Sequence, residues 1–251
     1  DLSGNGIRFA NYYVQPICTP TRASLMTGRY SIHTGSEHIL FGSYEPSCLP
    51  VRLPLMSNAF KRIGYSVHAV GKWHLGYEDK FSPLDQGFDD FVGFLGGNID
   101  YFRHKELSDL EVYLSGRETI RGRKGYTTNL ITQDAIQFLA GCRKVPDRPF
   151  FLYLPHAAPH FPFQGPEDDD GGMPSAEEWS TGNRKTYIKM MKNLDASVGA
   201  VLQELDAIGA ADNTIVVFTS DHGAMKPGLN TPWRDYNCLL YTSPSPRDDQ
   251  T

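Results

Sequence analysis

The residues with the clearest chemical potential lie near the N-terminus, where Cys18 precedes Arg22 in the stretch Cys-Thr-Pro-Thr-Arg. Pro20 suits the first turn of a helix, and Gly28 suits its end. This helix would begin just after Cys18 and carry Arg22 about one turn further on. Its positive dipole end and the guanidinium should both lower the pKa of the thiol. The same place suits a bound anion, although a lone cysteine beside a helix cap is more often a buried structural residue.

Three further polar clusters directly follow stretches that predict β-strands. They are Lys72 and His74 after 65–70, His160 after 150–154, and Asp221 and His222 after 214–219. Because the carboxyl ends of parallel strands meet at one edge of an open α/β sheet, these clusters can converge with Cys18. Each cluster alone has an ordinary explanation, as an exposed loop, a packing histidine or a turn. Four clusters together favour a functional site.

Alternating strand and helix signals predict a three-layer α/β fold with a mostly parallel sheet. The expected strands cover 7–14, 65–70, 150–154 and 214–219, with a hairpin around 112–114 and a short strand within 85–94. The expected helices cover 55–63, 127–140 and 184–208, besides the one that starts near Pro20. The almost continuously apolar run at 214–219 predicts a buried parallel strand.

In the last predicted helix, apolar residues recur every three or four positions, which predicts the face that packs on the sheet. These residues are Tyr187, Met191, Leu194, Val198, Val201, Leu202 and Leu205. We interpret them as core and not as a cofactor-binding motif.

Composition excludes several classes of protein. The 251 residues are 40% hydrophobic, which suits one large globular α/β domain. A net charge of −5 without any basic run argues against nucleic-acid binding. No stretch is long and apolar enough to predict a transmembrane segment. The cysteines, at positions 18, 48, 142 and 238, show no zinc-binding spacing and leave disulfide pairing open.

Cys-x-Pro-x-Arg, followed by the Thr-Gly-Arg-Tyr turn at 27–30, resembles the signature of type I sulfatases. Thr21 stands where most members of that family have Ser, which is a mild departure. The segment 64–74 is similar to the family's second signature, with Val67 in place of the usual Ser or Thr. The two motifs together outweigh the structural interpretation of Cys18.

The resemblance extends over most of residues 6–236. Residues 152–162 and the Asp-His-Gly turn within 220–223 are also similar to family segments. Residues 27–35 and 87–90 most resemble the arylsulfatase B group. The resemblance implies an alkaline-phosphatase-like fold, incomplete here, with 1–236 forming part of the N-terminal catalytic domain. It also implies a sulfated small molecule or glycan as substrate, and a full-length protein that is secreted, lysosomal or periplasmic.

The resemblance implies that a formylglycine-generating enzyme oxidises Cys18 to formylglycine, whose hydrated aldehyde is the nucleophile in sulfate monoester hydrolysis. Arg22 and a divalent metal would hold that hydrate, and Lys72 would bind the sulfate oxygens. His160 would protonate the departing alcohol. His74 would remove the second hydroxyl proton, so that sulfate leaves as the aldehyde re-forms.

The resemblance also implies metal ligation by Asp221, His222 and the converted Cys18. Calcium is the first choice for this oxygen-rich family site. Because an imidazole is slightly soft for calcium, Mg²⁺ and Mn²⁺ stay open as alternatives.

Two elements of the family pattern have no match in the sequence. The first is an Asp-Asp pair that completes the family's metal site and that would precede residue 1. The second is a lysine that the family has at the position of Asn237. Lys226 is nearby, but we do not expect it to replace that lysine. We therefore expect a fragment, without its signal peptide, that binds metal weakly and has little activity. The Ser/Pro/Asp-rich stretch 237–251 is expected to be a disordered, foreign tail.

Two other functions stay open beside that of a sulfatase. One is a phosphatase or phosphodiesterase of the same superfamily, which would use Thr or Ser as nucleophile and two zinc ions; the Cys-x-Pro-x-Arg motif argues against it. The other is a non-catalytic, sulfatase-like protein that keeps an anion pocket. Formylglycine at position 18 would distinguish the enzyme from the binding protein.

Overall fold

The computed structural model of this chain describes residues 2, 4–9, 12–40, 49–107, 112–169 and 171–230. The predicted tail at 237–251, with Asn237 and Cys238, lies outside the described residues, and so does Cys48. Within the described part of the chain, no helix has the length and apolar character needed to cross a bilayer.

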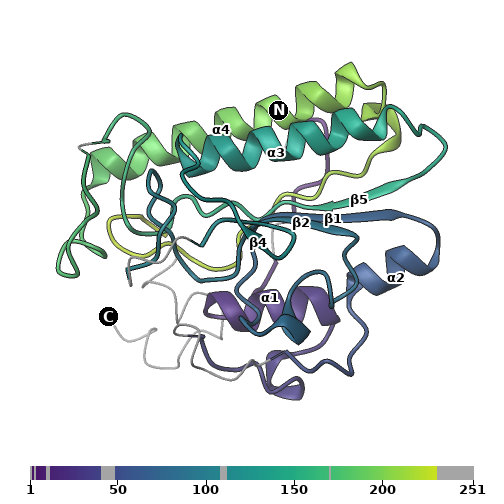
Figure 1. The fold of residues 1–251 in the computed structure, drawn as a ribbon, viewed down its shortest axis with the longest axis horizontal. Helices are drawn as coiled ribbons and strands as arrows, with labels where there is room; N and C mark the ends of the chain where they lie inside the picture. Colours follow the sequence, from purple (N-terminus) through teal and green to yellow (C-terminus); the bar gives the residue numbers. More distant parts are fainter. Residues whose placement is uncertain are drawn as a thin grey trace, which may run out of the picture.

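A five-stranded mixed sheet forms the middle layer of the fold (Figure 1). In chain order its strands are β1 (Ser66–Lys72), β2 (Asp90–Phe94), β3 (Leu114–Ser115), β4 (Glu118–Thr119) and β5 (Phe150–Tyr153). Their order across the sheet is β4-β3-β2-β1-β5. The strand β1 pairs in parallel with β2 and β5, whereas β3 and β4 form the predicted antiparallel hairpin. The parallel strands therefore end at one edge of the sheet.

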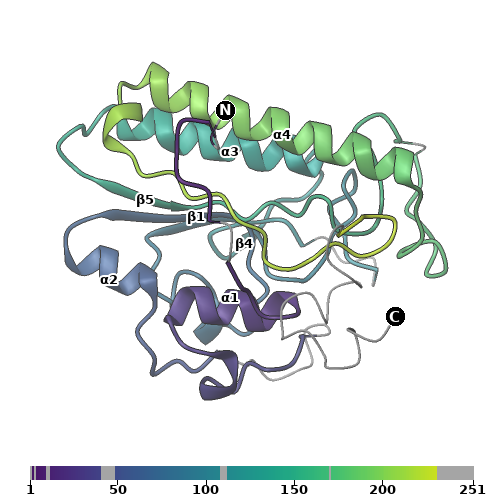
Figure 2. The same ribbon diagram turned by 180° about the vertical axis from the view of Figure 1, so that it is seen from behind.

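Helices cover both faces of this sheet, as the two opposite views show (Figures 1 and 2). The long helices α3 (Thr127–Cys142) and α4 (Arg184–Ala207) lie together on one face, and α1 (Cys18–Thr27) and α2 (Met56–Arg62) lie on the other. Short 3₁₀ helices are η1 (Ser31–His33), η2 (Asp79–Phe81) and η3 (Ala211–Asn213). The expected three-layer α/β architecture is confirmed, and the four predicted helices are all present.

The strand β1 contributes to two hydrophobic cores because successive side chains of a strand point to opposite faces. Val70 packs into the core on the α3 and α4 side, together with Ile131. Val67 and Ala69 pack into the core on the α1 and α2 side. This burial on both faces fixes the position of the strand whose end carries Lys72.

The predicted strand over 214–219 is wrong for this structure. Residues 214–220 form no strand, and Ile215 and Val217 are 92% and 80% exposed. The edge strand β5 pairs with β1 but with no other strand among the described residues. A strand needs a neighbour to complete its backbone hydrogen bonds, so apolar β-propensity alone does not make one.

Two smaller predictions also need correction. The described residues within 7–14, which are 7–9 and 12–14, form no strand. In α4, Met191 is 41% exposed, whereas Met190 is completely buried among the core residues on that face of the sheet. The predicted helix is therefore present, but at this turn the residue that faces the sheet is Met190 and not the predicted Met191. The short strand expected within 85–94 is β2, a central strand of the sheet.

Candidate active site

Three chain segments far apart in the sequence meet at the carboxyl edge of the sheet. Cys18, at the start of α1, is buried, and its Sγ lies 3.4 Å from Lys72 Nζ at the end of β1. His222, in the loop after 214–219, places its Nε2 3.0 Å from the same sulfur. The predicted convergence of these three residues is therefore present in the structure.

The first turn of α1 gives Cys18 its position. Cys18 is the first helical residue and not the residue before the helix, because Ile17 provides the extended N-cap. The backbone N–H of Thr21 donates to Ile17 O at 3.2 Å, which closes the first turn. At the other end Gly28 adopts a left-handed conformation, with φ of 66°, and its N–H donates to Ser24 O.

Arg22 connects the loop that carries Asp221 to the ends of β1 and β5. It is buried and donates from Nε and Nη2 to Asp221 Oδ2, at 3.1 and 2.8 Å. Its Nη1 donates to the carbonyl of Lys72 at 2.9 Å and to the hydroxyl of Tyr153 at 3.3 Å. Burial favours the neutral form of Asp221, but Arg22 and Lys72 outweigh it and lower the pKa of that carboxyl to about 2.

The environment of Cys18 strongly favours the thiolate. Burial alone would raise the pKa of the thiol, but the Lys72 ammonium, the hydrogen bond with His222 and the nearby rings of His160 and His74 outweigh burial and lower it far below its usual value. The site thus stabilises a negative charge at the position of Sγ, whichever group carries it.

The three histidines around Cys18 share one arrangement, in which a backbone carbonyl accepts a hydrogen bond from one ring nitrogen. The pairs are His74 Nε2 with Leu40 O at 3.0 Å, His160 Nδ1 with Phe161 O at 2.9 Å, and His222 Nδ1 with Gly223 O at 2.8 Å. A carbonyl can only accept, so that nitrogen carries a proton and the other nitrogen of a neutral ring has a free lone pair.

The histidines differ in their charge. Burial lowers the pKa of His74 and of His160. For His222, burial acts in the same direction, but its hydrogen bond to Cys18 and the charge of Asp221 outweigh it and raise the pKa. His74 and His160 can therefore accept protons, whereas His222 shares one with the sulfur.

His74 is held tightly in an unusual backbone conformation, with φ of 58°. Its backbone N–H donates to Leu95 O at 3.0 Å, and its carbonyl accepts from the Thr19 hydroxyl at 3.3 Å. A Cβ added at Gly97 would lie 2.6 Å from Cε1 of the ring. Among the described residues, no group makes a well-aligned hydrogen bond to His74 Nδ1, which is buried. His74 thus presents Nδ1 as a fixed acceptor.

His160 is positioned through its backbone. The completely buried Tyr101 donates its hydroxyl to His160 O at 3.0 Å. His156, four residues earlier, belongs to no cluster. Neither of its buried ring nitrogens has a partner among the described residues, and burial lowers the pKa of His156 to about 4.

Sequence reasoning missed the supporting residues Tyr101, Tyr153, Leu40 and Gly97. Tyr153 lies in the predicted strand next to the site, which is a weak signal. The others act through a backbone carbonyl, a distant hydroxyl or a missing side chain, and no residue pattern marks these features.

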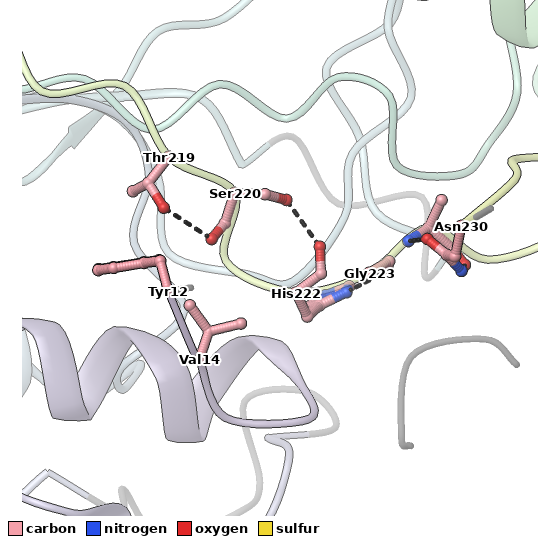
Figure 3. A pocket seen from close by; sticks show the side chains of 8 residues that line it. Tyr12, Val14, Thr219, Ser220, His222, Gly223 and Asn230 are labelled. Carbon is pink, nitrogen blue, oxygen red and sulfur yellow. Dashed lines mark hydrogen bonds between the residues drawn. The ribbon is translucent and has the colours of Figure 1, made fainter. Parts of the chain in front are cut away.

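A cavity of about 330 Å³ opens beside His222 (Figure 3). Its lining combines Tyr12 and Val14 from the N-terminal segment with Thr219, Ser220, His222, Gly223, Ala224 and Asn230. In the close view, the 219–223 loop curves around the cavity while the N-terminal segment closes it from the other side. The cavity gives solvent and ligands a route to the His222 side of the cluster.

The predicted metal ligands also converge. One donor atom each from Cys18, Asp221 and His222 lies within 4.8 Å of the other two. Arg22 binds Asp221 Oδ2, which leaves Oδ1 toward His222 Nε2 at 3.7 Å. This donor set fits a divalent cation; replacing the sulfur by an oxygen, as formylglycine does, makes it suitable for a hard ion such as Ca²⁺.

Fold and site together define an alkaline-phosphatase-like α/β protein with a cationic, metal-capable site at the carboxyl edge of its sheet. The sequence profile described as Sulfatase matches residues 1–239, and the chain therefore belongs to the sulfatase family. Members of this family generally use a divalent metal and a formylglycine residue.

Individual relatives agree with this assignment. Arylsulfatase J of Mus musculus is 35% identical over 239 residues, covering 92% of this chain and 39% of the relative. N-acetylgalactosamine-6-sulfatase of Homo sapiens is 31% identical over 242 residues, covering 89% of this chain and 44% of the relative. The chain thus spans less than half the length of these curated relatives.

Among solved structures, Ps i-CgsB in complex with k-i-k-neocarrahexaose superimposes with a TM-score of 0.78 at 29% identity. The match covers 89% of this chain and 52% of that structure. It confirms the expected alkaline-phosphatase-like fold over the matched region.

Proposed function

We propose that this chain carries the nucleophile and the sulfate-binding groups of a sulfuric ester hydrolase. The observation that supports this most directly is that Lys72 and three histidines surround Cys18 Sγ. The adjacent Arg22 is paired with Asp221. Residues 1–236 would form part of the catalytic domain, and 237–251 a tail outside it.

Two groups would supply chemistry that the unmodified side chains lack. Formylglycine, made from Cys18 by a formylglycine-generating enzyme, would supply a nucleophilic hydroxyl. A divalent metal, Ca²⁺ as the first choice, would be held by Asp221, His222 and the converted residue 18, and would act as a Lewis acid.

The chain's own residues would perform the remaining tasks. Lys72 would bind the sulfate oxygens, and its ammonium already stabilises a negative charge at residue 18. Arg22 would hold Asp221 in place. His160 would donate a proton from Nε2 to the departing alcohol oxygen. Because Nδ1 already donates to Phe161 O, this role requires the doubly protonated ring, which the negative charge of the bound sulfate would favour. His74 would take a proton from residue 18 on Nδ1, since Nε2 is held by Leu40 O.

We extend the proposal to sulfated glycans as the substrate class. The support is that the structural relative Ps i-CgsB was solved with a carrahexaose and that a curated relative is named N-acetylgalactosamine-6-sulfatase. Family resemblance also favours a secreted, lysosomal or periplasmic location for the protein.

Co-expression with a formylglycine-generating enzyme tests the proposal. Mass spectrometry of the peptide containing Cys18 should show replacement of the CH₂SH group by CHO. The converted chain should then hydrolyse an aryl sulfate above the level of a Cys18→Ala control. Turnover should be slow, because the cluster found among the described residues, which is residue 18, Asp221 and His222, supplies three of the roughly six to eight ligands that calcium takes.

The alternatives give different results. Hydrolysis of an aryl phosphate in preference to the sulfate would favour a phosphatase. Formylglycine formation without any hydrolysis, but with sulfate binding by calorimetry, would favour the anion-binding protein. An unmodified Cys18 after co-expression would contradict the proposal outright.

A further inference from the structure

The unconverted form of the site, in which residue 18 still carries sulfur, has a different donor chemistry. Its donors are a thiolate, an imidazole nitrogen and one carboxylate oxygen, from Cys18, His222 and Asp221. Thiolate and imidazole are ligands that zinc prefers, whereas calcium requires oxygen ligands. The same three positions therefore suit different metals before and after oxidation of Cys18.

We propose that the chain with an unconverted Cys18 binds zinc through Cys18 Sγ, His222 Nε2 and Asp221 Oδ1. Conversion of Cys18 would then change the metal preference of the site from zinc to a hard cation. The inference rests on the same donor cluster as the proposed function, but it does not depend on catalysis.

The distances between the donors support this assignment. Tetrahedral zinc holds a sulfur and a nitrogen ligand roughly 3.5 Å apart, given its usual bond lengths. His222 Nε2 lies 3.0 Å from Cys18 Sγ and 3.7 Å from Asp221 Oδ1. Both distances are within about half an ångström of this spacing, and the sulfur and a carboxylate oxygen of Asp221 lie within 4.8 Å of each other.

Groups behind the donors already orient them as in a metal site. His222 Nδ1 donates to Gly223 O at 2.8 Å, which directs Nε2 toward the sulfur. Arg22 occupies Asp221 Oδ2 and leaves Oδ1 for the metal. Ligating histidines and carboxylates in metalloproteins have such outer partners, which fix the ring tautomer and the direction of the lone pair.

Access and charge set the limits of this site. Of the three donor residues, His222 lines the cavity, so the cavity gives a metal ion an approach from the His222 side (Figure 3). Lys72 opposes the metal, because its ammonium lies 3.4 Å from the sulfur and repels a second cation. The proposal thus predicts that removing the Lys72 charge strengthens zinc binding.

The test uses the chain from a host without formylglycine-generating activity, with mass spectrometry confirming the free thiol. Cobalt(II) is the probe, since its thiolate complexes show a sulfur-to-metal charge-transfer band and tetrahedral sites show strong visible bands. We expect one equivalent of cobalt to produce both features. Zinc should abolish them, and excess calcium should not.

Variants locate the metal. Cys18→Ser should lose the charge-transfer band, while Cys142→Ser, which removes the other described free thiol, should keep it. His222→Ala should weaken zinc binding at least about tenfold, since even outer partners of a ligand contribute about 10–100-fold. Lys72→Met should strengthen it at least about tenfold. Circular dichroism confirms that each variant is folded.

A charge-transfer band that persists in Cys18→Ser, or that is absent from the wild-type chain, would overturn the proposal. Weaker zinc binding by folded Lys72→Met would also contradict it. Sulfate hydrolysis is measured on the converted chain and zinc binding on the unconverted one. The two measurements therefore test the hydrolase function and the zinc site separately.

Discussion

Arg22 and Asp221 form a two-point contact across 199 residues of sequence, with Arg22 Nε and Nη2 both donating to Oδ2, at 3.1 and 2.8 Å. This pair joins α1 to the loop that carries His222. The loop follows a segment without strand pairing. The ion pair and the direct contact of His222 Nε2 with Cys18 Sγ therefore hold this loop against α1.

Removing the charge of Asp221 should destabilise the fold in a pH-dependent manner. Because the pKa of Asp221 is lowered in the folded chain to about 2, its stabilisation is present above the unfolded pKa and is lost as pH falls toward 2. Asp221→Asn should cost about 2 kcal/mol at pH 7 in urea unfolding, with the difference from wild type shrinking below pH ~4.

The exposed Asp147 provides a matched control. Asp147→Asn should change the unfolding free energy by less than about 0.5 kcal/mol at any pH. An equal loss in both variants would show that the Arg22 contact contributes nothing specific.

Gly97 should be required for the position of His74. A Cβ at Gly97 would lie 2.6 Å from Cε1 and 2.7 Å from Nε2 of the buried ring, which is tied to Leu40 O. In Gly97→Ala we expect the ring to move and the ¹⁵N shifts of His74 to change in NMR spectra. Any sulfatase turnover should fall by about 100-fold, a cost that a misplacement of about 1 Å can have.

The neighbouring Gly96 supplies the control, because a Cβ there meets the end of the flexible Glu106 side chain and not His74. Gly96→Ala should leave the His74 resonances in place. Unchanged His74 resonances in folded Gly97→Ala would refute the positioning role.

The Tyr101 hydroxyl should position His160 through its carbonyl. Tyr101→Phe leaves that carbonyl without its donor, which should cost about 1–2 kcal/mol in unfolding free energy. Release of the His160 backbone should also lower kcat for sulfate hydrolysis more than it changes KM.

Tyr126 allows a direct comparison, since its ring stacks on Tyr101 with centroids 5.1 Å apart and its hydroxyl donates to Gln164 O. Tyr126→Phe should lose similar stability but keep kcat. If both variants lowered kcat equally, Tyr101 would have only a structural role.

The sequence predicted the candidate site well because strand ends are visible in a residue pattern. Lys72 is the last residue of β1 and His160 follows β5, and both lie close to Cys18. Asp221 and His222 also reach it, although the strand predicted before them is absent. Their position comes from Arg22, a contact that no periodicity reveals.

Supporting contacts could not be predicted for a different reason. Leu40, 34 positions from His74, contributes backbone groups, its carbonyl to the His74 ring and its N–H to Thr19, and Gly97 contributes only the absence of a side chain. Backbone groups are the same in every residue, so their placement depends on the complete loop conformation. The apolar pattern of 214–219 likewise records propensity but not the presence of a pairing partner.

The two adjacent methionines of α4 test which face of the helix packs on the sheet. Met190 is completely buried in the core between sheet and helices, whereas Met191 is 41% exposed. Met190→Ala should therefore cost about 2–5 kcal/mol in unfolding free energy, because it removes buried atoms and leaves a cavity. Met191→Ala should cost less than about 1 kcal/mol, and alanine's higher helix propensity offsets part of even that. Urea unfolding monitored by circular dichroism measures both. Equal losses would mean that the helix is rotated toward the face that the sequence pattern predicted.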